Sequence, residues 1–219
     1  MFSVFRVTGF YEEPSTLGAA ILALLSIYSK SRNWKIDKLF ILSIIACFLT
    51  LSTAIWIIAA IFAVSIVLFN TRPKNLLVYA LFLCAFFAIL FTSSYYAIQV
   101  EKFNSRVEMR TGLIDQIERR DADLAFWGPG PYGVEPEVHN EVFASNSSKL
   151  ASINDAGSLM FMIVHFGYFA LIIMSLILFF IKDTKSRLIF LILSMTKISI
   201  FHPIYLFVLA IYTVKLDRD

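Results

Sequence analysis

Residues 39–69 read LFILSIIACFLTLSTAIWIIAAIFAVSIVLF, and no charged side chain interrupts this run. A helix that crosses the hydrocarbon core of a bilayer needs about 20 apolar residues, so the run is long for one helix and short for two. Lys38 precedes it and Arg72 follows it, and basic residues gather at the cytoplasmic ends of membrane helices. We therefore predict a hairpin of two short helices, with both ends in the cytoplasm and residues 50–53 at its outer tip.

Apolar runs separated by basic linkers continue in both directions from this hairpin. They cover residues 17–28, 76–97, 158–181 and 188–214. Pro14 precedes the first run, and proline is typical of the first turn of a helix. The last run repeats the hairpin pattern, with Pro203 near its centre. The sequence predicts an all-α, polytopic bundle of about seven transmembrane helices, in which two pairs form short hairpins.

The composition is that of a membrane protein rather than a soluble domain. Hydrophobic residues make up 58% of the 219 residues and charged residues 16%, whereas soluble domains are about half apolar and a quarter charged. The 22 phenylalanines come without a dense basic patch, so nucleic acid is not an expected partner. We expect residues 1–219 to form one membrane domain that lies in the lipid bilayer.

The placement of lysine and arginine predicts the orientation of the helices. Short segments with clustered bases begin at Lys30, Arg72, Lys182 and Lys215. Such segments decide the topology, because long loops follow the charge rule poorly. Residues 1–15 and the polar loop of residues 101–155 are then external.

The first part of this loop, residues 102–120, has the apolar periodicity of a helix. Arg106 and Arg110 are four residues apart and share one face, and Arg119 and Arg120 end the segment. Two interpretations are open. The segment is either an interfacial amphipathic helix with solvated arginines, or an anion clamp, because guanidinium groups bind phosphate oxygens in a bidentate manner.

The second part of the loop opens with WGPGPYG at residues 127–133, which include Gly128 and Gly130. Proline and glycine at this density predict a rigid, irregular turn, which is either a connector or a support for aromatic side chains that pack on a sugar. His139 and Asn140 follow. A histidine here is either a surface residue or a group for proton transfer near neutral pH.

Polar residues near or within the apolar runs are also candidates. Glu13 either caps the first helix or faces the same external cavity as the loop. Lys197 lies inside an apolar hairpin, where an unpaired charge is costly, so we expect it to pair or to reach the interface. His165 is expected to make a hydrogen bond between helices. The sequence has no metal-ligand spacing and no phosphate-binding loop, so we expect no metal and no cofactor.

Three stretches resemble a known family. Residues 6–15 read RVTGFYEEPS, which is similar to the R-x-x-G-x-x-x-E-P-S stretch of bacterial O-antigen polymerases of the Wzy type. Residues 49–52 read LTLS, which resembles their L-T-x-S turn. The loop, with its arginines, its WGPGP and its His139-Asn140 pair, resembles the large periplasmic loop that these polymerases share with O-antigen ligases. The resemblance covers essentially the whole chain, and only the C-terminal half to two thirds of a typical member.

The resemblance implies a metal-independent glycosyltransferase of the bacterial inner membrane. It would polymerise oligosaccharide units carried on undecaprenyl pyrophosphate, with loop 101–155 in the periplasm. Bases for the attacking hydroxyl would be His139 or Glu13, and a partner would be a chain-length regulator or an upstream membrane half. The residues that would bind the leaving pyrophosphate are Arg6, Arg106, Arg110, Arg119 and Arg120. The alternatives are a transporter or flippase for lipid-linked sugars, and an inactive fragment or accessory subunit.

Overall fold

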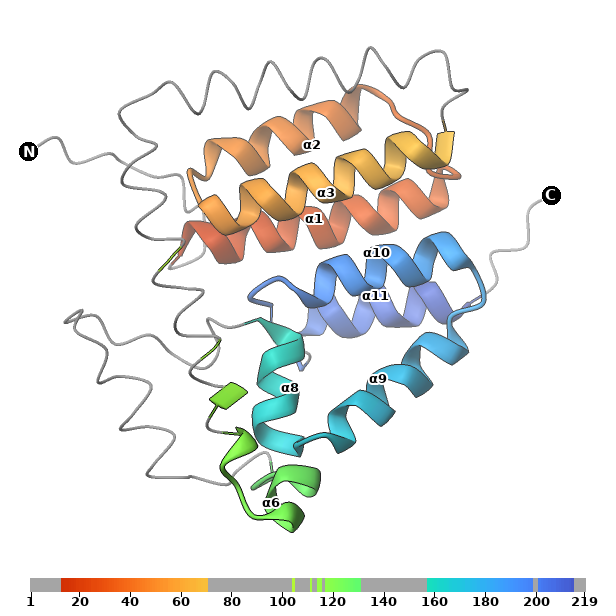
Figure 1. Ribbon diagram of the computed structural model, residues 1–219. Coiled ribbons are helices and arrows are strands. Elements are labelled where there is room, and N and C mark those ends of the chain that lie inside the picture. The colour runs from red at the N-terminus through yellow and green to blue at the C-terminus, as the bar shows by residue number, and fades with distance from the viewer. Residues whose placement is uncertain are drawn as a thin grey trace, which may run out of the picture.

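The computed structural model describes residues 13–70, 104, 111, 114–115, 117–130, 157–198 and 201–214. Every element of regular structure in these residues is an α-helix, which confirms the predicted all-α class (Figure 1). The helices are α1 (Pro14–Ser31), α2 (Lys38–Leu49), α3 (Thr53–Asn70), α6 (Ala122–Trp127), α8 (Ser158–Phe166), α9 (Phe169–Phe180), α10 (Thr184–Ser194) and α11 (Pro203–Thr213).

Both predicted hairpins are present: residues 50–52 join α2 to α3, and the turn between α10 and α11 is described at residues 195–198 and 201–202. The first turn is tight because Leu51 adopts a left-handed conformation with φ 51°. The Thr50 hydroxyl donates to the Cys47 carbonyl at 2.7 Å, and the Trp56 indole N–H donates to the Phe48 carbonyl at 2.7 Å. These side-chain bonds add to the backbone bonds that the same two carbonyls accept from the Thr50 and Leu51 N–H groups at the end of α2.

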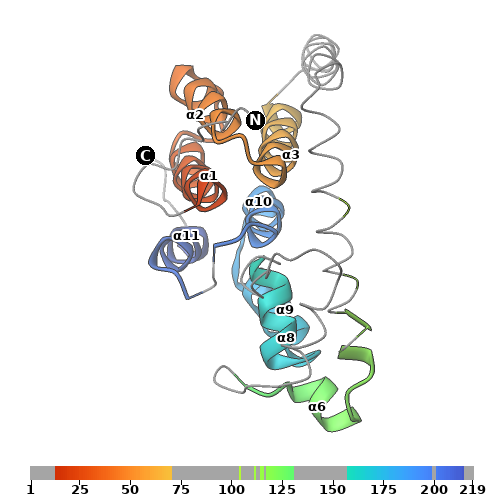
Figure 2. The ribbon, with the colours of Figure 1, turned by 90° about the vertical axis from the view of Figure 1, so that its left-hand side faces the viewer.

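Five helices (α1, α2, α3, α10 and α11) run alongside one another, and Figure 2 views them nearly along their axes. Among them, α1, α3 and α10 touch one another pairwise. Gly18 permits the close approach of α1 to α3, since a Cβ atom there would lie 2.6 Å from Ile55 Cγ2. Ala19 and Ala23 are also buried on α1, and small residues of this kind allow close helix packing in membranes.

The run of residues 158–181, predicted as one continuous span, is divided into α8 and α9. The break lies at Gly167, whose φ is 56°. Backbone from the loop occupies the space beside it, because a Cβ atom on Gly167 would lie 2.6 Å from the Phe126 carbonyl oxygen. The Tyr168 N–H donates to the Ala125 carbonyl at 2.9 Å instead of continuing the helix. The prediction of a single helix was therefore wrong.

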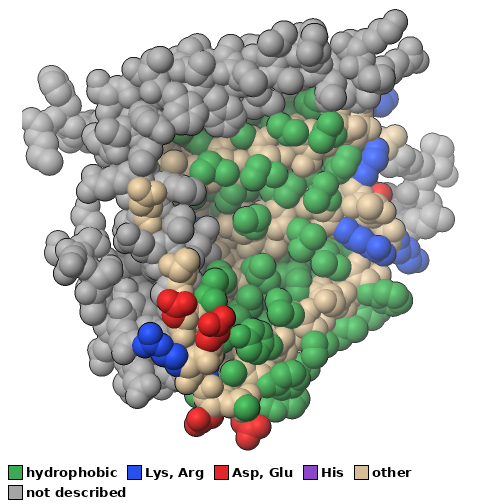
Figure 3. Space-filling model, in the orientation of Figure 1, with side chains coloured by type: hydrophobic (Ala, Val, Ile, Leu, Met, Phe, Trp, Pro, Cys, Tyr) green, Lys and Arg blue, Asp and Glu red, His purple; other side chains and the backbone are tan. Residues whose placement is uncertain are grey.

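One helix in the described residues, α3, is long and apolar enough to cross a membrane, while α2, α9 and α11 are shorter apolar helices. The predicted span at residues 76–97 lies outside the described residues. Large apolar side chains are exposed along several helices, among them Leu42 at 61% and Phe179 at 75%. Figure 3 shows hydrophobic side chains across α3 and along α9. The count of about seven spans stays a prediction.

The five helices have two distinct ends. The tip end carries the start of α1 and the described residues of the two hairpin tips, which are 50–52, 195–198 and 201–202. The basic end carries the starts of α2 and α10 and the ends of α1, α3 and α11. Lysine and arginine side chains gather at the basic end, on the right of Figure 3.

Cations at the basic end bind carbonyl groups at the C-termini of helices. Lys30 Nζ donates to the Ile211 carbonyl at 2.8 Å, Lys185 Nζ to the Phe69 carbonyl at 3.4 Å, and Arg187 Nε to the Ile181 carbonyl at 2.6 Å. Each cation also lies at the negative end of the helix dipole that it caps. These basic residues therefore stabilise the bundle directly, whatever their effect on topology.

Candidate functional site

A group of polar residues lies at the tip end, where α1, α3 and α10 come together. Glu13 and Ser15 flank Pro14, the first residue of α1, and Ser52 directly precedes α3. Lys197 lies in the tip that follows α10. These three helices touch pairwise, so residues from distant parts of the sequence share one end of one helix junction. We call Glu13, Ser15, Ser52 and Lys197 the tip cluster.

Glu13 and Lys197 form an ion pair across 184 positions of sequence, with Lys197 Nζ 2.9 Å from Glu13 Oε2. The Ser15 hydroxyl donates to the same carboxylate oxygen at 3.0 Å. This bears out the expectation that Lys197 would pair. Glu13 occupies the N-cap position of α1, but its side chain makes no capping hydrogen bond to the helix backbone. Its carboxylate instead faces the neighbouring tip.

The segment that returns from the loop holds the backbone around Lys197. The Ser158 N–H donates to the Thr196 carbonyl at 3.1 Å, and the Ser158 hydroxyl donates to the Ile198 carbonyl. Gly157, with φ 100°, lies so close to the tip that a Cβ atom on it would be 3.0 Å from the Met195 carbonyl oxygen. The two carbonyls that flank Lys197 are thus both fixed by one buried serine.

Two buried hydroxyl groups lie one helical turn from the close contact between α1 and α3. Ser15 precedes Gly18 by three residues and Ser52 precedes Ile55 by three, on helices that run in the same direction. Ser15 is 5% exposed and Ser52 is 4% exposed. The Ser52 hydroxyl makes no hydrogen bond in the described part of the chain. A buried hydroxyl without a partner is costly, and such a group is typical of a site that a water or a ligand completes.

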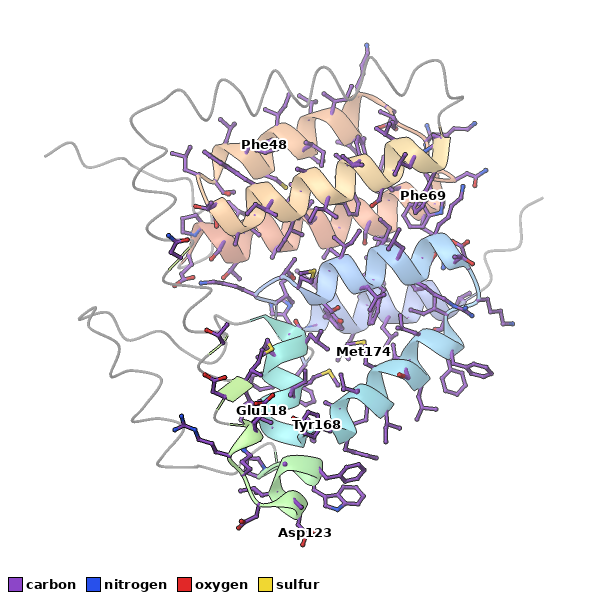
Figure 4. The ribbon with its side chains drawn as sticks, in the orientation of Figure 1. Phe48, Phe69, Glu118, Asp123, Tyr168 and Met174 are labelled. Carbon is purple, nitrogen blue, oxygen red and sulfur yellow. The ribbon has the colours of Figure 1, made fainter. Side chains whose placement is uncertain are left out.

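The loop residues form a second structure, which we call the loop clasp, at the other end of α8. Arg120 Nη2 donates to the Val164 carbonyl at 3.1 Å, and the Gly130 N–H donates to the His165 carbonyl at 2.8 Å. His165 Nδ1 lies 3.1 Å from the Gly130 carbonyl oxygen. The loop therefore caps the C-terminus of α8, and Figure 4 shows Glu118 and Tyr168 in this region. His165 therefore bonds to the loop, and not across a helix pair as the sequence had led us to expect.

Glycines make the loop clasp sterically possible. Gly128, with φ 67°, would place a Cβ atom 2.6 Å from the Gly167 nitrogen, so each of these glycines packs against backbone of the other segment. Trp127 projects from the clasp with 58% of its surface exposed, and its ring lies 5.0 Å from that of Phe169. The described part of the proline- and glycine-rich turn, residues 127–130, thus packs on the end of α8 and presents the Trp127 side chain.

The structure brings some of the predicted site residues together and separates others. Glu13 lies in the tip cluster, whereas Arg119, Arg120, Gly128 and Gly130 lie at or beside the loop clasp. The two groups are separated by the 9 residues of α8, or about 13 Å at the rise of an α-helix. The remaining predicted residues lie outside the described residues: Arg6, Arg106, Arg110, His139 and Asn140. Within the described ranges no group of side chains is arranged to hold a metal ion.

The sequence pointed to Lys197 and to the turn that contains Ser52, but it placed neither residue in the site, and it gave no signal for Ser158. The signal for Lys197 was a single cation inside an apolar hairpin, which requires a partner. Its partner could not be read from the sequence, because the pairing follows from the packing of α10 beside α1.

Comparison with known proteins identifies no relative: no family model, no curated protein and no solved structure matches the chain. The tip cluster is therefore the basis for assigning a function. Its chemistry comprises a carboxylate, a cation and two hydroxyl groups at one end of an apolar helical bundle.

Proposed function

We propose that this chain is a membrane glycosyltransferase that polymerises oligosaccharide units carried on undecaprenyl pyrophosphate. The observation that carries the proposal is the tip cluster. Glu13-Pro14-Ser15 and Leu49-Thr50-Leu51-Ser52 belong to two of the three stretches that resemble the O-antigen polymerases, and they lie at the same end of adjoining helices. A polar site at one end of an apolar bundle suits a substrate with a sugar head and a lipid tail.

The proposed setting is the bacterial inner membrane, with about seven spans and the tip end in the periplasm. Exposed apolar side chains on α2, α3 and α9 suit contact with lipid. The cations collect at the opposite end, as expected for a cytoplasmic face. Loop 101–155 and residues 1–15 are then external.

The reaction requires two things of the protein. A hydroxyl of the acceptor must lose its proton as it attacks the anomeric carbon of the donor, and the leaving pyrophosphate must be stabilised. Glu13 or His139 would accept the proton. Fixed guanidinium groups, with Arg6, Arg106 and Arg110 as the candidates, would stabilise the negative charge without a metal. Arg119 and Arg120 lie at or beside the loop clasp, one length of α8 from the tip cluster.

The test is restoration of glycan chain length in a bacterial strain that lacks its O-antigen polymerase and makes a matching repeat unit. The proposal predicts long chains with the wild-type protein and single units with Glu13→Gln. A reporter fused at Tyr132 should be active only in the periplasm. A cytoplasmic signal from that fusion would contradict the topology and the reaction together.

A transporter for lipid-linked sugars is the second candidate, because buried polar side chains lie between α1 and α11. Ser26, Ser29 and Tyr212 are each at most 1% exposed, and the Ser29 hydroxyl has no hydrogen-bond partner in the described residues. These groups could line part of a polar path. Uptake of a lipid-linked sugar into sealed vesicles, without chain growth, would favour transport over polymerisation.

A further inference from the structure

We propose that Lys197 binds the diphosphate of the lipid-linked donor by exchanging its partner, so that the substrate's phosphate replaces the Glu13 carboxylate. The ion pair seen here is then the resting state of the site. This inference rests on the proposed function. It adds Lys197 as a phosphate-binding residue, and it adds the order in which Lys197 leaves Glu13 before Glu13 accepts a proton. The residue and the order both follow from the geometry of the tip cluster.

The cation of the pair is fixed and its anion lies at the surface. The Lys197 side chain is 14% exposed, whereas the Glu13 side chain is 53% exposed. Ser158 holds the carbonyls on both sides of Lys197, so the ammonium group is presented from a constrained backbone. An approaching ligand would meet the carboxylate first, with the ammonium group directly behind it.

An exchange of anions is energetically reasonable at such a site. A partly exposed ion pair contributes little to stability, so it is easily replaced. A diphosphate brings more negative charge and more acceptor oxygens than one carboxylate, and it forms charge-assisted hydrogen bonds with an ammonium group. The buried Ser52 hydroxyl, which makes no hydrogen bond in the described residues, is a further donor at the end of the adjoining helix.

The exchange prepares the base for the reaction. While Lys197 and Ser15 bind Glu13 Oε2, two hydrogen bonds occupy that oxygen. Once Lys197 binds phosphate, Glu13 can take the proton from the acceptor hydroxyl. The hydroxyl oxygen forms a bond to the anomeric carbon, the bond from that carbon to the diphosphate oxygen breaks, and its electron pair leaves on the diphosphate.

The first measurement is the thermal stabilisation of the purified full-length protein in detergent by inorganic pyrophosphate. Lys197→Met should raise the half-saturating concentration about 10- to 100-fold, the effect of losing a hydrogen bond to a charged group, and Lys197→Arg should retain binding. Glu13→Gln should lower that concentration, because it removes the competing carboxylate. Lys185→Met, which removes a lysine at the basic end, is the matched control and should leave pyrophosphate binding unchanged.

The second measurement uses the exchanged pair Glu13→Lys with Lys197→Glu in the chain-length assay. The pair can re-form, so thermal stability should recover while chain growth stays absent. Wild-type chain growth in this double variant would show a purely structural ion pair and overturn the inference. The inference would also be overturned if Lys197→Met changed the half-saturating pyrophosphate concentration by less than twofold, or if Glu13→Gln raised it. A different outcome separates the two proposals. If neither the wild type nor any variant extends glycans, while pyrophosphate binding still depends on Lys197, the polymerase function is contradicted and the phosphate-binding site at Lys197 is supported.

Discussion

Replacing Gly18 with alanine should destabilise this protein, although alanine normally stabilises a helix. In an ordinary helix interior the change gains about 0.5–1 kcal/mol. Here the new Cβ atom would lie 2.6 Å from Ile55 Cγ2 and 3.0 Å from Ile55 Cγ1, whereas carbon atoms pack best at about 3.5–4.0 Å. Ile55 is 1% exposed and branched at Cβ, so it has no open space into which it can turn.

The magnitude follows from two opposing effects. Overpacking of a close-packed core costs about 1–3 kcal/mol, and the helical preference for alanine offsets part of it. Gly18→Ala should therefore lower the free energy of unfolding by about 0.5–2 kcal/mol. In an Ile55→Ala background both Cγ atoms are gone, and the nearest remaining atom of residue 55 is Cβ at 3.3 Å. There the same change should become neutral or stabilising, by up to about 1 kcal/mol.

The assay is denaturant or thermal unfolding of the purified protein in one detergent, as a double-mutant cycle. Ile61→Ala provides the control background, because Ile61 is 44% exposed on α3 and should not couple to residue 18. A Gly18→Ala substitution that stabilises the protein in the wild-type background would refute the close approach of α1 and α3. An equal loss in the Ile55→Ala and wild-type backgrounds would refute the assigned contact.

Three further predictions concern turns and helix ends. Gly167→Ala should destabilise the protein and expose the loop to limited proteolysis, because φ is 56° and loop backbone fills the adjoining space. Trp34→Ala should lower the free energy of unfolding by about 3–5 kcal/mol, since Trp34 is 2% exposed and packs edge-on against Phe69 and Tyr212. Hydrogen bonds from the Tyr28 hydroxyl and the Phe40 N–H lower the pKa of Asp37. Its stabilising contribution is therefore present above the unfolded-state pKa and is lost as pH falls through the folded-state pKa, so Asp37→Asn should flatten the acid end of a plot of Tm against pH.

The hairpins could be predicted because their signals are local. Residues 50–53 interrupt an apolar run that is too long for one helix, and the structure turns there. Pro203 breaks the second run and becomes the first residue of α11, since proline lacks the N–H that an interior position requires. Pro14 begins α1 for the same reason.

The break at Gly167 and the pair of Glu13 with Lys197 could not be predicted, because each depends on a segment distant in sequence. Residues 158–166 and 169–180 are both apolar and helical, and nothing local requires them to separate. The break follows from backbone at Ala125 and Phe126, which occupies the side of Gly167. A pattern of apolar residues specifies which face of a helix is buried, but not which loop covers its end.

The short helix α8 links the two parts of the candidate site. Ser158 at its start holds the tip that carries Lys197, and the Arg120 and Gly130 bonds hold its end to the loop. The helix has only 9 residues, and Gly157 and Gly167 at its two ends pack closely against neighbouring backbone. One end of α8 therefore cannot shift without the other. A displacement of the loop clasp would therefore be transmitted to the carbonyls beside Lys197. Loop residues such as Arg120 then affect the tip cluster through the position of α8, even though about 13 Å of helix separates them from Lys197.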